Sequence, residues 1–108
     1  MDTSYKYIED LATLIEIPAD GVLSRTVYAD ERVKAVIFGF DKGQELSEHT
    51  ASMPAIIQIV QGQAQVTLGG DTHVAGVGAW VYMPANLSHS VHATTPVVML
   101  LLLLKAHK

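Results

Sequence analysis

The chain has 108 residues, of which 49% are hydrophobic and 17% are charged, and its formal net charge is −4. This length leaves room for one hydrophobic core, so we expect a single domain over residues 1–108. The seven basic residues are scattered, which argues against a nucleic-acid-binding surface. The absence of cysteine excludes disulfides, thiolate metal sites and a cysteine nucleophile, and is typical of a reducing, cytoplasmic location.

The first twenty residues predict a short helix. Apolar residues recur at positions 8, 11, 12 and 15, which is a helical spacing, and Pro18 follows the pattern. The segment is too polar and too acidic for a secretory signal. The longest apolar run, residues 96–104, is far shorter than the ~20 residues that span a bilayer as a helix. We therefore expect a cytoplasmic protein that does not bind membranes.

The rest of the chain, from residue 22 to residue 104, predicts β-structure. Short segments rich in β-branched and aromatic residues alternate with turns of glycine, proline and aspartate. The predicted strands are residues 23–29, 33–40, 44–50, 54–61, 63–69, 79–84, 89–93 and 97–104. The stretch GGDTHVAGVG at 69–78 is interpreted as turns. A series of this kind indicates an all-β antiparallel sandwich or small barrel.

The last predicted strand, VVMLLLLL at 97–104, is apolar on both faces. One face can fill the barrel interior, but the other needs cover from the N-terminal helix or from a second subunit. We therefore expect a homodimer.

Two segments each open on a glycine and contain histidine: residues 43–62 contain His49, and residues 78–93 contain His89 and His92. In the first, Gly43 is followed by five residues and then by His49, and the segment closes at Gly62. In the second, Gly78 is followed by five residues and Pro84, and the histidine at position 89 comes after four more.

These segments resemble the two motifs of the cupin superfamily, and the resemblance covers residues 22–104. It implies a small, single-domain RmlC-like cupin, whose fold is a double-stranded β-helix, or jelly-roll, barrel. Asn86 stands where the second motif has a glycine. The change is mild, because asparagine tolerates the left-handed backbone that such a position requires.

The resemblance also implies a place for a divalent metal ion. The family's first motif carries His-x-His and a glutamate, and its second motif carries a third histidine. His49 and His89 match two of these positions, whereas Ala51 and Ala55 occupy the other two. Imidazole suits Zn, Ni, Mn or Fe, but alanine ligates nothing, so the implied site is degenerate. Gln58 is a further candidate ligand, although alternation from Ala55 points it outward.

The two matching histidines also have a structural interpretation, as buried neutral side chains that are each satisfied by a hydrogen bond. A ligand pocket beside them would be lined by Met53, Ile57 and Trp80, for which core packing is the alternative. His73 and His92 are expected on the surface, because the first follows a turn and alternation sends the second to the opposite face from position 89.

Two functional hypotheses follow. In the first, the barrel binds a small molecule, with His49 and His89 as hydrogen-bonding anchors or as a degenerate metal site. In the second, the protein is a small metal-dependent cupin enzyme of dioxygenase or isomerase type with non-standard ligands. The alanines favour the first hypothesis, and the presence of both histidines favours the second. The sequence names neither a substrate nor a catalytic residue.

Overall fold

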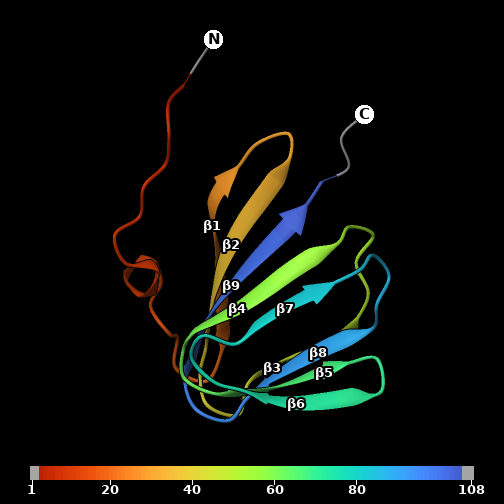
Figure 1. Cartoon of the computed structure of the whole chain (residues 1–108). Helices are drawn as coiled ribbons and strands as arrows, with labels where there is room; N and C mark the ends of the chain where they lie inside the picture. The colour runs from red at the N-terminus through yellow and green to blue at the C-terminus, as the bar shows by residue number, and fades with distance from the viewer. Residues whose placement is uncertain (1–2, 106–108) are drawn as a thin grey trace.

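The computed structural model describes residues 3–105, and these residues form nine strands (Figure 1). The ends of the expected single domain, residues 1–2 and 106–108, lie outside the described part. The strands are β1 (Val22–Ala29), β2 (Val33–Phe40), β3 (Glu45–His49), β4 (Ala55–Gln61), β5 (Ala64–Leu68), β6 (Asp71–Ala75), β7 (Trp80–Met83), β8 (His89–Ala93) and β9 (Val97–Leu104).

The strands form two antiparallel sheets that face each other (Figure 1). Sheet A has the order β1-β2-β9-β4-β7, and sheet B has the order β3-β8-β5-β6. From β3 onward the chain passes repeatedly from one sheet to the other, which is the connectivity of a jelly roll. The fold class expected from the sequence is therefore confirmed.

The core lies between the two sheets and follows strand alternation. In β4, Ala55, Ile57 and Ile59 are buried while the residues between them are partly exposed. The same period of two buries Ala64 and Val66 on β5. The buried members of this cluster are Phe40, Ala55, Ile57, Ile59, Ala64, Val66, Ala75, Met83, Val91, Ala93, Val97 and Met99.

The predicted N-terminal helix is wrong in extent. The structure has a single 3-10 turn, η1 (Leu11–Leu14), which the Asp10 side chain caps by accepting a hydrogen bond from the Ala12 amide at 3.1 Å. Ile15 is already extended, with a φ of −145°. A nucleus this short gains few helical hydrogen bonds, so packing against the sheet decides the conformation. No helix in the described residues is long and apolar enough to cross a membrane.

The N-terminal segment instead lies across the outer face of sheet A, the face turned away from sheet B (Figure 1). Ile15 packs with Ile37 of β2 and Val98 of β9, and all three are buried. Of the apolar residues that predicted a helix, Ile15 is therefore buried in extended chain, while Ile8, Leu11 and Ala12 are partly exposed. The segment covers the outer side of β9 at its Val98 end.

The stretch 69–78, which was expected to be turns, contains strand β6. This strand pairs with β5 from Ala64↔Ala75 to Leu68↔Asp71, and the hairpin turns at Gly69, whose φ is 59°. Four of its five residues are exposed, which explains why its sequence lacks the apolar alternation that predicts a strand. The eight predicted strands all form, with ends that differ by no more than one residue.

Candidate functional site

His49 and His89 meet on adjacent strands of sheet B. They are register partners on β3 and β8, and their ring centroids lie 4.2 Å apart with an angle of 59° between the rings. His89 is 7% exposed, whereas His49 is exposed to solvent. The pair therefore joins a buried ring to a ring at the protein surface, and we call it the histidine pair.

A β-bulge in β3 brings His49 to this position. Leu46 pairs with Val91, and the next aligned pair is His49 with His89, so three steps along β3 match two along β8. Plain alternation would place Leu46 and His49 on opposite faces. The extra residue returns His49 to the inward face that Leu46 shares. On β8 no correction is needed, because His89, Val91 and Ala93 are all buried.

Each ring of the pair is oriented by a backbone carbonyl two residues earlier in the chain. The Nδ1 atom of His49 lies 2.7 Å from the Ser47 oxygen, and Nδ1 of His89 lies 2.9 Å from the Leu87 oxygen. A carbonyl oxygen only accepts hydrogen bonds, so Nδ1 donates in both rings. In the neutral form, each Nε2 therefore keeps its lone pair available.

The loops that carry the two histidine segments are tied together beside the pair. The amide of Asn86, in the loop before β8, donates to the carbonyl of Ala51, in the loop after β3, at 2.8 Å. Asn86 has a φ of 69°, which is the left-handed conformation expected for the residue in the glycine position. The two segments are thus neighbours in space as well as matching motifs in sequence.

Comparisons with known proteins identify the family and the fold. A family model described as Cupin domain matches residues 36–103. The chain belongs to the cupin superfamily. The solved structures similar to this cupin include a conserved protein of unknown function from Streptococcus pyogenes, with 30% identity and a TM-score of 0.85, covering 97% of this chain and 92% of that one. No curated protein matches the chain.

Two further solved structures share the fold of this cupin. A cupin superfamily protein from Desulfitobacterium hafniense is 25% identical with a TM-score of 0.86, covering 95% of this chain and 94% of that chain. KdgF from Halomonas sp. is 22% identical with a TM-score of 0.77, covering 86% of this chain and 87% of that chain. The likeness to KdgF shows the fold alone.

The residues present in this cupin do not fit a resident metal ion of the family type. Ala55 occupies the glutamate position, faces the core and is 3% exposed. Ala51 occupies the second histidine position, and its side chain offers no donor atom to a metal. Within residues 3–105, no group of three or more histidine, cysteine, aspartate or glutamate side chains is arranged to hold a metal. Zinc sites use at least three protein ligands, and the histidine pair supplies two.

The other residues expected at the site fall into two groups. Ile57 is 2% exposed in the core, and Met53 lies partly exposed in the β3–β4 loop. Gln58 and Trp80, however, are register partners on the outer face of sheet A, and Trp80 is 59% exposed. They are not brought together with the histidine pair, because strand alternation from Ile57 turns Gln58 away from the interior.

Within residues 3–105, two further histidines lie outside the pair. His92 faces away from His89, and its Nδ1 lies 3.5 Å from an Oε2 of Glu45, with both side chains well exposed. An exposed pair of this kind contributes little to stability. His73, on the edge strand β6, is also exposed.

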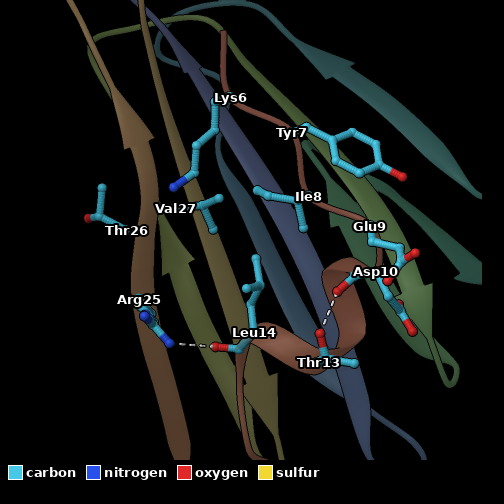
Figure 2. A pocket seen from close by; sticks show the side chains of 10 residues that line it. All are labelled: Lys6, Tyr7, Ile8, Glu9, Asp10, Thr13, Leu14, Arg25, Thr26 and Val27. Carbon is cyan, nitrogen blue, oxygen red and sulfur yellow. Dashed lines mark hydrogen bonds between the residues drawn. The ribbon is translucent and has the colours of Figure 1, made fainter.

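A cavity of about 480 Å³ that no sequence pattern predicted lies between the N-terminal segment and β1 (Figure 2). Figure 2 shows Lys6 and Arg25 on one side of it and Glu9 and Asp10 on the other. Arg25 donates a hydrogen bond to the Leu14 carbonyl at 3.2 Å, which ties β1 to the segment. The cavity arises from the extended path of the segment, which no local pattern predicts.

Proposed function

We propose that this cupin binds a small molecule beside the histidine pair, and that His49 and His89 hold its polar end. The observation that carries the proposal is the pair of Nδ1 hydrogen bonds to backbone carbonyls, at 2.7 and 2.9 Å. These bonds fix both rings with their Nε2 atoms available, on rings whose centroids are 4.2 Å apart. Rings held in this way need little reorganisation when a ligand binds.

The chemistry of the pair indicates the class of ligand. Two Nε2 lone pairs accept hydrogen bonds, so they suit a molecule that presents a hydroxyl or amine hydrogen. Apart from His49, the neighbours of His89 on the inner face of sheet B are apolar: Leu68 is its register partner on β5, and Val91 follows on β8. A small molecule with an apolar body and a hydroxyl or amine group therefore suits the surroundings of the histidine pair best.

A second candidate function is a small metal-dependent enzyme of dioxygenase or isomerase type that uses Zn, Ni, Mn or Fe. One observation favours it. Metal-bound histidines usually donate their other ring N–H to a carbonyl or carboxylate, and both rings of the pair do so. Because the pair supplies two ligands, the bound molecule or water would have to supply the rest. An ion would then bind tightly only together with its small molecule.

Calorimetry with a panel of small alcohols, amines and hydroxy acids, each with and without Zn²⁺, Ni²⁺, Mn²⁺ or Fe²⁺, tests both functions. We expect a ligand whose affinity falls at least about tenfold in His49→Ala and in His89→Ala, which corresponds to about 1.4 kcal/mol. His73→Ala is the matched control, because His73 is an exposed histidine on another strand, and it should leave the affinity unchanged.

The outcomes separate the two candidates. Binding without added metal supports the small-molecule function, whereas binding that requires both metal and ligand supports the second candidate. Imidazole ¹⁵N chemical shifts provide an independent check, because the neutral rings should carry their hydrogen on Nδ1. A hydrogen on Nε2 in either ring would contradict the observation on which both candidates depend.

A further inference from the structure

The cavity between the N-terminal segment and β1 is separate from the histidine pair (Figure 2). Its walls come from residues 6–10, 13–14 and 25–27, which belong to sheet A and to the segment that crosses it, whereas both histidines of the pair lie in sheet B. Its volume of about 480 Å³ is in the range of small-molecule sites, ~300–1,000 Å³. The protein therefore has a second place of suitable size for a small ligand.

The middle of this cavity is apolar and is held by the core. Ile8, Leu14 and Val27 line it, and we call these three residues the apolar floor (Figure 2). Leu14 and Val27 pack against the buried cluster that contains Ile15 and Ile37 on the outer face of sheet A. Because the floor is anchored in this way, the apolar group of a ligand can be buried there with little reorganisation.

A β-bulge in β1 shapes the wall opposite the N-terminal segment. The register shifts between Thr26 and Tyr28, so Val27 is an extra residue on β1. Arg25 is the register partner of Ile37, which packs against the segment, so Arg25 also lies on the face that the segment crosses. Bulges re-aim side chains and are frequent next to active sites.

Charged side chains of both signs surround the apolar floor. Lys6 and Arg25 stand on one side of it (Figure 2). Glu9 and Asp10 stand on the other side. Within residues 3–105, neither Lys6 nor Arg25 forms an ion pair with a carboxylate. The two groups of opposite charge therefore remain apart, with the apolar floor between them.

These charged groups keep hydrogen-bonding capacity for a ligand. Arg25 donates from Nη1 to the Leu14 carbonyl at 3.2 Å, and the rest of its planar guanidinium can still bind a carboxylate. Asp10 accepts a hydrogen bond from the Ala12 amide through one carboxylate oxygen, Oδ1. In the described part of the chain, the Lys6 ammonium and the Glu9 carboxylate have no partner at all.

We propose that this cavity binds a small zwitterion with an apolar side group, of the class of an aliphatic α-amino acid. The carboxylate of the ligand lies against Lys6 and Arg25, and its ammonium group lies against Glu9 and Asp10. Its side group rests on the apolar floor. This site is independent of the proposed function, because it contains neither residue of the histidine pair.

The arrangement of charge favours a zwitterion over an ion of one sign. A simple anion that binds Lys6 and Arg25 also meets the two carboxylates, and a simple amine meets the two cations, so each suffers like-charge repulsion. A zwitterion places each of its charges beside the opposite charge. The four charged side chains are exposed, so water screens each contact. We therefore expect weak binding, with a Kd of about 1 mM at low salt.

Titration with leucine and two truncated analogues, followed by ¹H–¹⁵N NMR, tests the ligand class. Isoamylamine has the side group and ammonium of leucine without the carboxylate, and isocaproate has the side group and carboxylate without the ammonium. We expect L-leucine to bind about fivefold or more tightly than either analogue, and to shift the amide signals of Ile8 and Val27. An analogue that binds as tightly as leucine would overturn the proposal, because one charge would then suffice.

Single charge removals test the two ends of the site. Lys6→Gln should weaken leucine binding about threefold and leave isoamylamine binding no weaker, since the amine has no carboxylate to lose. Glu9→Gln should weaken leucine binding by a similar factor and leave isocaproate binding no weaker. Arg25 and Asp10 stay unchanged, because their hydrogen bonds hold the segment in place.

The matched controls remove the same charges outside the cavity. Lys42→Gln and Glu31→Gln lie in turns that do not line it, and both should bind leucine like the parent chain. An equal loss in these controls would mean that net charge sets the affinity, which overturns the proposal. His49→Ala should also bind leucine like the parent chain. A loss in that variant would place leucine at the histidine pair and overturn the assignment to this cavity.

Discussion

His49 and His89 are register partners on β3 and β8, and their imidazole rings lie 4.2 Å apart between centroids. They occupy two of the four ligand positions of the cupin motifs, and the other two hold Ala51 and Ala55. Ala55 faces the core from β4, in the opposite sheet, and is 3% exposed. The backbone of a metal site is therefore present, while half of its donor atoms are missing.

Restoring the family ligands should restore metal binding. We expect Ala51→His combined with Ala55→Glu to raise the affinity for Zn²⁺ or Ni²⁺ by roughly 100-fold or more, which is about 2.7 kcal/mol. Without metal, the buried glutamate should lower the free energy of unfolding by about 1–3 kcal/mol, because a desolvated carboxyl group lacks a partner. Calorimetric titration and thermal unfolding with and without metal measure both effects.

The matched control for this pair of substitutions is Gln58→Glu. It adds a carboxylate to the same strand, but on the outer face of sheet A, where Gln58 pairs with Trp80. We expect no gain in metal affinity from it. If Gln58→Glu raised the metal affinity as much as Ala51→His combined with Ala55→Glu, the strand register around Ala55 would be wrong.

Gly62 forms the turn between β4 and β5, and the space that a side chain would need there is occupied by the carbonyl of Pro96. Its φ is +84°, and a Cβ added here would overlap the Pro96 oxygen. We expect Gly62→Ala to lower the free energy of unfolding by about 3 kcal/mol or more, since it combines left-handed strain with a backbone clash. Urea unfolding followed by circular dichroism measures this change.

Gly43 separates the two contributions. It has the same φ of +84°, but no atom lies within 4 Å of an added Cβ. Gly43→Ala should therefore cost only the left-handed strain, about 1–2 kcal/mol. Equal losses in the two variants would contradict the close approach of Gly62 to Pro96.

Most of the barrel could be predicted from the sequence, because β-branched segments, glycine turns and motif spacing all indicate the same fold. The bulge between Leu46 and His49 could not, since nothing in ELSEH distinguishes a bulged strand from a regular one. Leu11 and Ile15 lie at helical spacing, yet a single 3-10 turn forms at Leu11–Leu14 and Ile15 is extended, because packing on the sheet face, and not local propensity, decides the conformation. Strand β6 was missed because an exposed edge strand needs no apolar alternation.

The candidate site could be predicted from the sequence only in part, for the same reasons. His49 and His89 could be identified because the motifs fix their spacing. Trp80 was expected near them as an aromatic residue of the second segment, but its register partner is Gln58, on the outer face. The cavity beside β1 depends on the path of the N-terminal segment, which is a property of the tertiary structure.

Acid should destabilise this cupin by protonating Asp41. Its carboxylate accepts hydrogen bonds from the amides of Asp20 and Lys42, at 2.7 and 2.8 Å. These bonds, the Asp20 amide first, lower the pKa of Asp41 from its ordinary value of 3.8. A carboxyl group whose pKa is lowered by folding stabilises the protein above its unfolded pKa, and this stabilisation is lost as the pH falls through the folded pKa. Asp41→Asn should therefore lower the Tm at pH 7, and the difference from the parent should shrink below about pH 4.

Asp30 provides a second, independent test of the same effect. The Tyr28 hydroxyl donates to its carboxylate at 2.7 Å, and the amides of Arg32 and Val33 also donate to it. These bonds, the Tyr28 hydroxyl first, lower the pKa of Asp30. The difference in Tm between Asp30→Asn and the parent chain should likewise shrink below about pH 4. Glu31→Gln removes an adjacent exposed charge and is the control, and a similar pH profile for it would show that net charge, and not the hydrogen bonds, sets the effect.

The packing of the N-terminal segment on sheet A should contribute measurably to stability. Ile15 is 9% exposed and packs with Ile37 and Val98, so Ile15→Ala removes buried methyl groups from this contact. We expect a loss of about 2 kcal/mol in the free energy of unfolding, at the low end for a core isoleucine because the site lies under a single segment of chain.

Hydrogen exchange should show faster exchange at the Thr13 amide, which bonds the Asp10 carbonyl, with little change in β4. The neighbouring Glu16 is exposed, and Glu16→Ala should change neither quantity. If Ile15→Ala has the same free energy of unfolding as the parent chain, the segment is not held by its apolar contacts.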